Sequence, residues 1–229
     1  LNKRVSLAGV GDTPEGTVVQ ATSHALTLAA SGLSVDQPVA ITGFRLTSTG
    51  GSGVNFGDGV QYIRIQDCTF ANLSGVGIRA GSAVDIAHIQ FIGLTFIGNK
   101  IDVYFSNETL ANNSDADDIL FDNCSFSGSQ KGIYVEKLSN SIIRDCVFNG
   151  VGSDSTYRWA AAVDINLKWD SFANIAIQDC TFTGCALGAQ NGVAIGIKAR
   201  GTGTDTGYAA SPATLDGVSP PLPPSAGHS

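Results

Sequence analysis

The sequence has no methionine, three histidines and few charged side chains. Charged residues make up 14% of the 229 residues, against about 25% in a typical soluble domain. Charge this scarce cannot solvate many helix faces, which disfavours a helical bundle. The net charge of −7 argues against a nucleic-acid-binding protein, because phosphate recognition requires clustered Lys and Arg. The sequence contains no apolar run of about 18 residues, so we expect no membrane span.

Several familiar kinds of site are also missing. The three histidines, His24, His88 and His228, are scattered, and there is no CxxC pair or GxxxxGK[ST] loop. We therefore expect neither a Ser-His-Asp triad, nor a zinc site, nor a nucleotide phosphate loop.

What the sequence does contain is an eight-residue repeat. Residues 63–70 (IRIQDCTF) recur as residues 175–182 (IAIQDCTF), with weaker copies at residues 39–46, 89–96, 119–126 and 141–148. Positions 1, 3, 6 and 8 are apolar, except Ser141, whereas positions 4 and 5 are mostly Asp, Asn, Gln or Gly. Alternation followed by a break predicts a strand, a corner at positions 4 and 5, and a second strand.

A second apolar pair follows each repeat and predicts a third strand. The pairs are Val54/Phe56, Val76/Ile78, Ile101/Val103, Ile133/Val135, Val163/Ile165 and Val193/Ile195. One such coil cannot bury its apolar side chains alone, but coils stacked about 4.8 Å apart bury them as continuous rows. An ordinary β-sandwich has no reason to repeat its corner residues in register.

These repeats predict an all-β fold, a right-handed parallel β-helix of about seven coils. We expect the β-helix to occupy residues 1–200. Residues 201–229 hold five of the seven prolines and are expected to form a Gly/Thr/Pro-rich linker or tail. This tail, or the ends of the β-helix, could mediate self-association.

The repeat resembles the right-handed parallel β-helix superfamily, which includes pectate-lyase-like and polygalacturonase-like enzymes and phage tailspikes. The resemblance implies an extracellular or cell-surface protein that binds, and could cleave, a polysaccharide as a lyase or glycoside hydrolase. The alternative is a non-catalytic structural or adhesive module of a surface protein, filament or tailspike. The Asp-Asp and Gly-His-Gly motifs of polygalacturonases are missing, so no catalytic residue is transferred from that family. The start at Leu1 without a signal peptide suggests a processed chain or a fragment.

The outward positions of the third strand carry the most chemistry. Stacking them by their apolar pairs predicts one row of Asn55, Gly77, Asp102, Tyr134, Asp164 and Ala194, and another of Gly57, Arg79, Tyr104, Glu136, Asn166 and Gly196. This alignment separates Asp102 from Asp164 by about 9–10 Å, with Glu136 between them. Carboxyl pairs at such distances catalyse glycoside hydrolysis. Alternatively, the clustered carboxylates could bind Ca²⁺ while Lys168 or Arg200 abstracts a sugar proton, as in a lyase.

The candidate catalytic residues are therefore Asp102, Glu136, Asp164 and Lys168. The candidate polysaccharide-binding residues are Arg79, Tyr104, Tyr134, Trp159, Asn166, Trp169, Lys198 and Arg200, since aromatic and polar groups beside a flat face suit sugar rings. The competing interpretation is a solvated face without a ligand. Asp115, Asp117 and Asp118 form an acidic knot that is either a solvated loop or a Ca²⁺ site, and no other cofactor is indicated.

Overall fold

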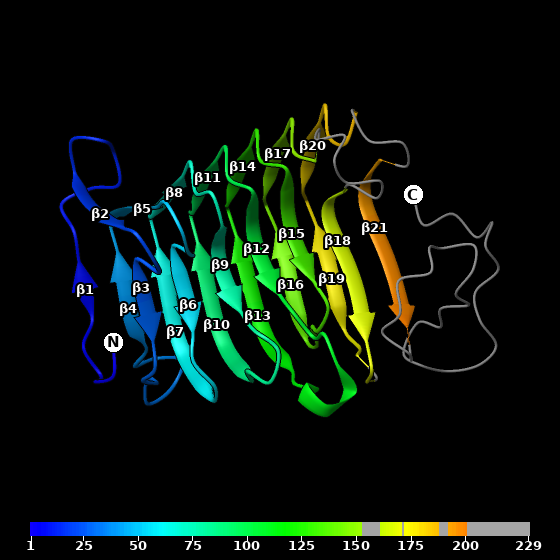
Figure 1. Ribbon diagram of the computed structural model, residues 1–229, viewed down its shortest axis with the longest axis horizontal. Helices are drawn as coiled ribbons and strands as arrows, with labels where there is room; N and C mark the ends of the chain where they lie inside the picture. Colours follow the sequence, from blue (N-terminus) through cyan, green and yellow to red (C-terminus); the bar gives the residue numbers. More distant parts are fainter. Residues whose placement is uncertain (153–160, 171, 188–191, 201–229) are drawn as a thin grey trace.

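The structure is a computed structural model and describes residues 1–152, 161–170, 172–187 and 192–200, with only the backbone described at 199 and 200 (Figure 1). The described residues form 21 strands and one short 3-10 helix, Leu110–Asn112, with no α-helix among them. The strands build three parallel sheets of seven strands each.

Each coil contributes one strand to each sheet. Sheet A contains β1 (Leu7–Ala8), β4 (Val39–Thr42), β7 (Val60–Gln66), β10 (Ile86–Ile92), β13 (Ala116–Asp122), β16 (Ser141–Arg144) and β19 (Ile175–Gln178). Sheet B contains β2 (Thr17–Ala21), β5 (Phe44–Ser48), β8 (Thr69–Ala71), β11 (Thr95–Ile97), β14 (Ser125–Ser127), β17 (Val147–Asn149) and β20 (Thr181–Thr183). Sheet C contains β3 (Leu26–Leu28), β6 (Val54–Phe56), β9 (Val76–Ala80), β12 (Ile101–Phe105), β15 (Lys131–Val135), β18 (Ala161–Lys168) and β21 (Val193–Arg200).

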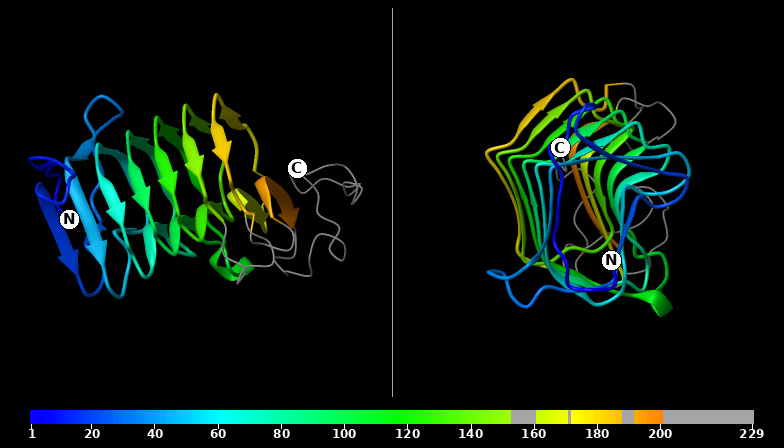
Figure 2. Two further views of the ribbon diagram at one scale, coloured as in Figure 1. Left: turned by 90° about the horizontal axis from the view of Figure 1, so that it is seen from above. Right: turned by 90° about the vertical axis from the view of Figure 1, so that its left-hand side faces the viewer.

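The coils superpose when the molecule is viewed along its long axis (Figure 2, right). Neighbouring strands in every sheet are parallel and belong to successive coils. The expected β-helix of about seven coils is thereby confirmed. The expected tail at residues 201–229 lies outside the described residues.

The corner between sheets A and B explains the polar positions of the eight-residue repeat. Position 5 adopts left-handed backbone in all six copies, with φ of 74, 50, 60, 53, 53 and 50° at Gly43, Asp67, Gly93, Asn123, Asp145 and Asp179. Glycine, Asn and Asp are the residues that tolerate this conformation best. The requirement for a left-handed corner therefore selects the Gly, Asn or Asp found there in every copy.

The interior is built from rows of identical or similar side chains. The last residues of the repeats, Phe70, Phe96, Phe126, Phe148 and Phe182, stack with ring centroids 4.4–4.9 Å apart. Beside them lies a row of small apolar groups that includes three buried, unbridged thiols, Cys68, Cys124 and Cys146. Burial raises the pKa of Cys68 to about 11. These cysteines pack as small apolar side chains rather than as reactive thiols.

Candidate functional site on the outward face of sheet C

Sheet C has a different register from the one expected. Its central interior row is Val54, Ile78, Val103, Ile133, Val163 and Ile195. Val76, Ile101 and Val193 lie two residues before this row, and they are half-buried rather than part of the core. The alignment by first apolar residue was therefore wrong by two residues in the coils that contain them.

The corrected register redistributes the polar side chains over two outward rows. The first row is Asn55, Arg79, Tyr104, Tyr134, Asp164 and Gly196. The second row pairs Asn166 with Lys198, and Glu136 directly follows β15 in the preceding coil. The expected neighbours Tyr134 and Asp164 are thus confirmed, whereas the expected pairing of Asp102 with Tyr134 is wrong.

Asp102 lies on the interior side of sheet C, not on its outward face. A Cβ placed on Gly77, its neighbour in the preceding coil, would lie 3.1 Å from the Phe96 ring, so this position points toward the phenylalanine row. Asp102 is fully buried and accepts hydrogen bonds from Asn99 Nδ2 (2.9 Å) and Ser129 Oγ (2.7 Å). Burial raises its pKa to about 7, although both hydrogen bonds oppose the shift. Asp102 is thereby removed from the surface that a polysaccharide could reach.

The centre of the outward face is a pair of stacked tyrosines. The rings of Tyr104 and Tyr134 are 5.0 Å apart and nearly parallel, at 3°. The Lys131 ammonium lies 4.0 Å from the centre of the Tyr134 ring and 3.4 Å from Asp164 Oδ2. Burial, reinforced by the negative charge of Glu136, raises the pKa of both tyrosines above the usual range. Both phenols therefore remain protonated at neutral pH.

Glu136 is the hub of a hydrogen-bond network beside the tyrosines. Its Oε1 accepts from the Tyr134 hydroxyl (2.7 Å) and from the Lys168 ammonium. Its Oε2 accepts from the backbone N–H of Asn107 (2.8 Å). Asn166 Nδ2 donates to the Tyr134 hydroxyl at 3.2 Å. Glu136 is 2% exposed, so this carboxylate is committed to holding strands β15 and β18 and the loop after β12 together.

The loop after β12 borders the site. Asn107 Nδ2 donates to the Lys168 carbonyl (3.0 Å), and Trp169 Nε1 donates to the Asn107 carbonyl (2.9 Å). Two buried oxygens in this region, Asp164 Oδ1 and Asn107 Oδ1, have no hydrogen-bond partner. Such orphaned acceptors are costly, but both atoms are buried and closed to a ligand in this conformation.

Of the remaining expected site residues, the structure places two on the outward face of sheet C and leaves the side chains of two undescribed. Arg79 donates to Asn55 Oδ1 at 3.2 Å, and Lys198 is buried beside Asn166 in the second row. Arg200 pairs with Lys168 through the backbone of β18 and β21, and its side chain is outside the described part. Trp159 also lies outside the described residues.

The acidic knot does not converge on one point. Asp115 Oδ1 accepts from the Ala116 N–H, Asp117 Oδ1 accepts from Asn140, and Asp118 Oδ2 lies 2.7 Å from His88 Nδ1. Within the described ranges, no group of three or more His, Cys, Asp or Glu side chains could hold a metal ion. The three carboxylates therefore engage different partners, and the Ca²⁺ site stays a prediction beside the solvated loop.

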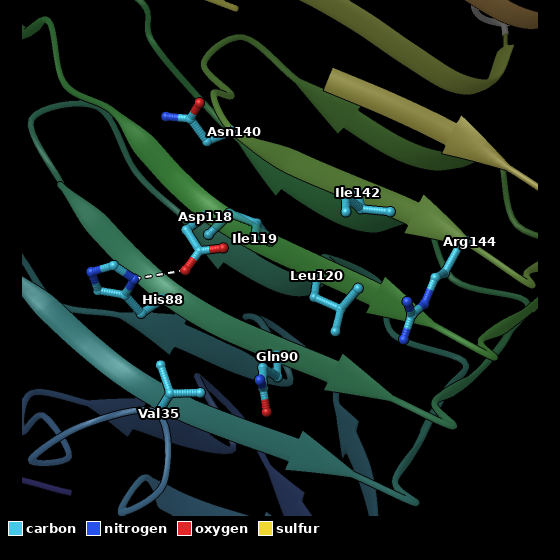
Figure 3. A pocket seen from close by; sticks show the side chains of 9 residues that line it. All are labelled: Val35, His88, Gln90, Asp118, Ile119, Leu120, Asn140, Ile142 and Arg144. Atoms are coloured by element: carbon cyan, nitrogen blue, oxygen red, sulfur yellow. Dashed lines mark hydrogen bonds and ion pairs between the residues drawn. The ribbon is translucent and has the colours of Figure 1, made fainter. Parts of the chain in front are cut away.

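A pocket on the outward face of sheet A was missed by the sequence reasoning (Figure 3). Its lining includes His88, Gln90, Asp118, Leu120 and Ile142. The available signal was the residue that immediately precedes each repeat, because these residues lie in one row of sheet A. They are Tyr62, His88, Asp118, Asn140 and Asn174.

The fold and this polar face define the chain as a right-handed parallel β-helix protein. The family model for the right-handed β-helix region matches residues 31–206, and the chain belongs to that family. No curated protein and no solved structure matches the sequence. Among the described residues, no helix is long and apolar enough to cross a membrane.

Proposed function

We propose that the chain is an extracellular or cell-surface polysaccharide-binding protein whose binding face is the outward side of sheet C. The observation that carries this proposal is the row formed by Arg79, the stacked Tyr104 and Tyr134, and Asp164. Aromatic rings offer apolar surfaces to the C–H faces of sugars, and charged and phenolic groups beside them bind hydroxyls.

The charge balance of the face supports a ligand that is held by ring stacking and hydrogen bonds rather than by ion pairs. The Lys131 and Lys168 ammonium groups are already paired with Asp164 and Glu136. A polysaccharide would therefore meet a face on which these two cations are already neutralised.

The geometry supports binding better than cleavage. A general acid or base has to reach the proton that it transfers, whereas both Glu136 oxygens are occupied and the side chain is almost fully buried. With Asp102 in the interior, Asp164 is the remaining carboxylate with an unpartnered oxygen on this face. The ion pairs of Glu136 with Lys168 and of Asp164 with Lys131 hold neighbouring coils together. They therefore favour the second candidate function, a non-catalytic structural or adhesive module.

The proposal is tested by binding the purified protein to a panel of neutral and acidic polysaccharides, with and without Ca²⁺. We expect Tyr104→Ala and Arg79→Ala to weaken retention of the bound polysaccharide at least about tenfold, as for central contacts of other interfaces. Arg45→Ala, an outward arginine on sheet B, is the matched control and should bind normally. If no polysaccharide is retained, the structural module is favoured. If shortened or unsaturated products are released, the protein cleaves the polysaccharide and the proposal of binding alone is wrong.

A further inference from the structure

One row of sheet A departs from extended backbone in every coil from β7 to β19. Tyr62, His88, Asp118, Asn140 and Asn174 have φ of 56, 56, 52, 49 and 58°. Asn, Asp and His tolerate this left-handed conformation better than most residues, whereas a bulky side chain such as that of Tyr62 is an outlier there. Two successive coils thus place aromatic rings at a position that the later coils fill with Asp or Asn. Backbone strain of this kind is typical of binding and catalytic sites.

Tyr62 and His88 form one rigid cluster. The Tyr62 ring stacks on the His88 imidazole with centroids 4.7 Å apart and planes at 4°. On the other side, His88 Nδ1 lies 2.7 Å from Asp118 Oδ2. The imidazole is therefore fixed from two directions before any ligand arrives, which lowers the entropy cost of binding.

A cavity of about 170 Å³ lies beside this cluster (Figure 3). Its apolar lining includes Leu120 and Ile142 from sheet A and Val35 from the loop before β4. Ile142 and Val35 are 36% and 44% exposed, so this apolar surface faces solvent. Drug-sized ligands need pockets of about 300–1,000 Å³, so this cavity suits a single ring.

The polar rim of the cavity has little net charge to select an ion. Its lining carries one carboxylate, Asp118, and one guanidinium, Arg144. Gln90 Oε1 already accepts from Arg64 Nε at 2.8 Å, which directs its amide group as a donor. An apolar floor with a hydrogen-bonding but charge-balanced rim fits a neutral, polyhydroxylated ring better than a uronate or a phosphate.

We propose that this cavity on sheet A binds one neutral sugar ring. The ring stacks its C–H face on Leu120 and Ile142, and its hydroxyls bond to Asp118 and the Gln90 amide. This site is separate from the face of sheet C and shares none of its residues, so either site can fail without the other.

Nuclear magnetic resonance of the histidine side chains tests the proposal directly, because the chain has three histidines. Neutral monosaccharides (glucose, galactose, mannose, xylose and N-acetylglucosamine) and galacturonate are titrated into the full chain, with expected Kd values near or above about 1 mM for a single ring. The His88 ring signals should shift and saturate with at least one neutral sugar. His24, which precedes β3 of sheet C and whose Nδ1 accepts from the Ser52 N–H, should not shift.

Two variants make the assignment specific. Ile142→Ser removes the apolar floor and should weaken the titration by about tenfold, and Asp118→Asn should weaken it while retaining a side chain that can bond to His88. Val147→Ser is the matched control, since Val147 is a 48% exposed aliphatic residue on sheet B. Thermal melting verifies that each variant is folded. The proposal is overturned if no neutral sugar shifts His88, if galacturonate alone does, or if Ile142→Ser and Val147→Ser titrate alike.

Discussion

The buried carboxyl of Asp102 should make the stability of the protein depend on pH. Asp102 is fully buried, and its Oδ2 has no hydrogen-bond partner. Its pKa is raised from 3.8 to about 7, chiefly by burial. Asp102→Asn is the perturbation of choice, because Asn has the same shape and retains an oxygen that accepts from Asn99 and Ser129, but never ionises.

The sign and size of the effect follow from proton binding. Between about pH 4 and pH 7 the folded state keeps the Asp102 proton while the unfolded chain has lost it, so the free energy of unfolding falls as pH rises. Above pH 7 the full penalty is present. The difference between 3.8 and about 7 corresponds to about 4 kcal/mol, at 1.36 kcal/mol per pH unit.

The assay is urea unfolding of wild type and Asp102→Asn at about pH 4, 5.5 and 8, the range over which the linkage acts. We expect the stability of the variant relative to wild type to rise by about 4 kcal/mol from the lowest to the highest pH. Other carboxyls titrate equally in both proteins and cancel. Asp122→Asn, the control, removes an ion pair with Arg144 near the surface. Its free energy of unfolding relative to wild type should change by less than about 1 kcal/mol over the same pH range. Parallel stability curves for wild type and Asp102→Asn would refute the burial argument.

Three further predictions address the interior and its corners. Phe126→Ala, which opens the ring stack between Phe96 and Phe148, should cost about 3–5 kcal/mol in urea unfolding, and a cost below about 1 kcal/mol would contradict the continuous row. Asn123→Val should destabilise by about 1–2 kcal/mol because of its left-handed backbone, whereas Asn123→Gly should melt close to wild type. Cys68 should react with Ellman's reagent only upon unfolding, since its thiol is buried and its pKa is raised to about 11; rapid labelling of this thiol in the native protein would contradict its placement in the core.

Sheets A and B could be predicted from the sequence because each repeat encodes both a period and a corner. The alternation of positions 1 and 3 fixes which side chains of sheet A point inward. The Gly, Asn or Asp at position 5 fixes where the chain turns, because the backbone there is left-handed. Asp67 and Asp179 therefore occupy equivalent corners although they are far apart in sequence, and Phe70 and Phe182 belong to one row.

Sheet C could not be aligned in the same way because its strands do not alternate regularly between inward and outward residues. In β9 and β12, a half-buried first residue is followed by two buried ones. Ile101 pairs in register with Lys131, and the Lys131 ammonium reaches Tyr134 and Asp164 on the outward face. Ile101 therefore begins its strand at an outward position despite being apolar. Asp102, the next residue, lies on the interior side of the sheet, so a candidate catalytic carboxyl is fully buried.

Four side-chain pairs among the described residues join neighbouring coils. Lys131–Asp164 joins β15 to β18, and Glu136–Lys168 joins the residue after β15 to β18. His88–Asp118 and Asp122–Arg144 join neighbouring strands of sheet A.

A catalytic role for Glu136 would require breaking its pair with Lys168, and loss of one partner from a buried pair costs about 3–5 kcal/mol. Glu136→Gln is therefore expected to lower stability whatever it does to the ligand, whereas Tyr104→Ala and Arg79→Ala leave that pair intact. Loss of binding in those two variants is the result that separates recognition by the face from its structural role.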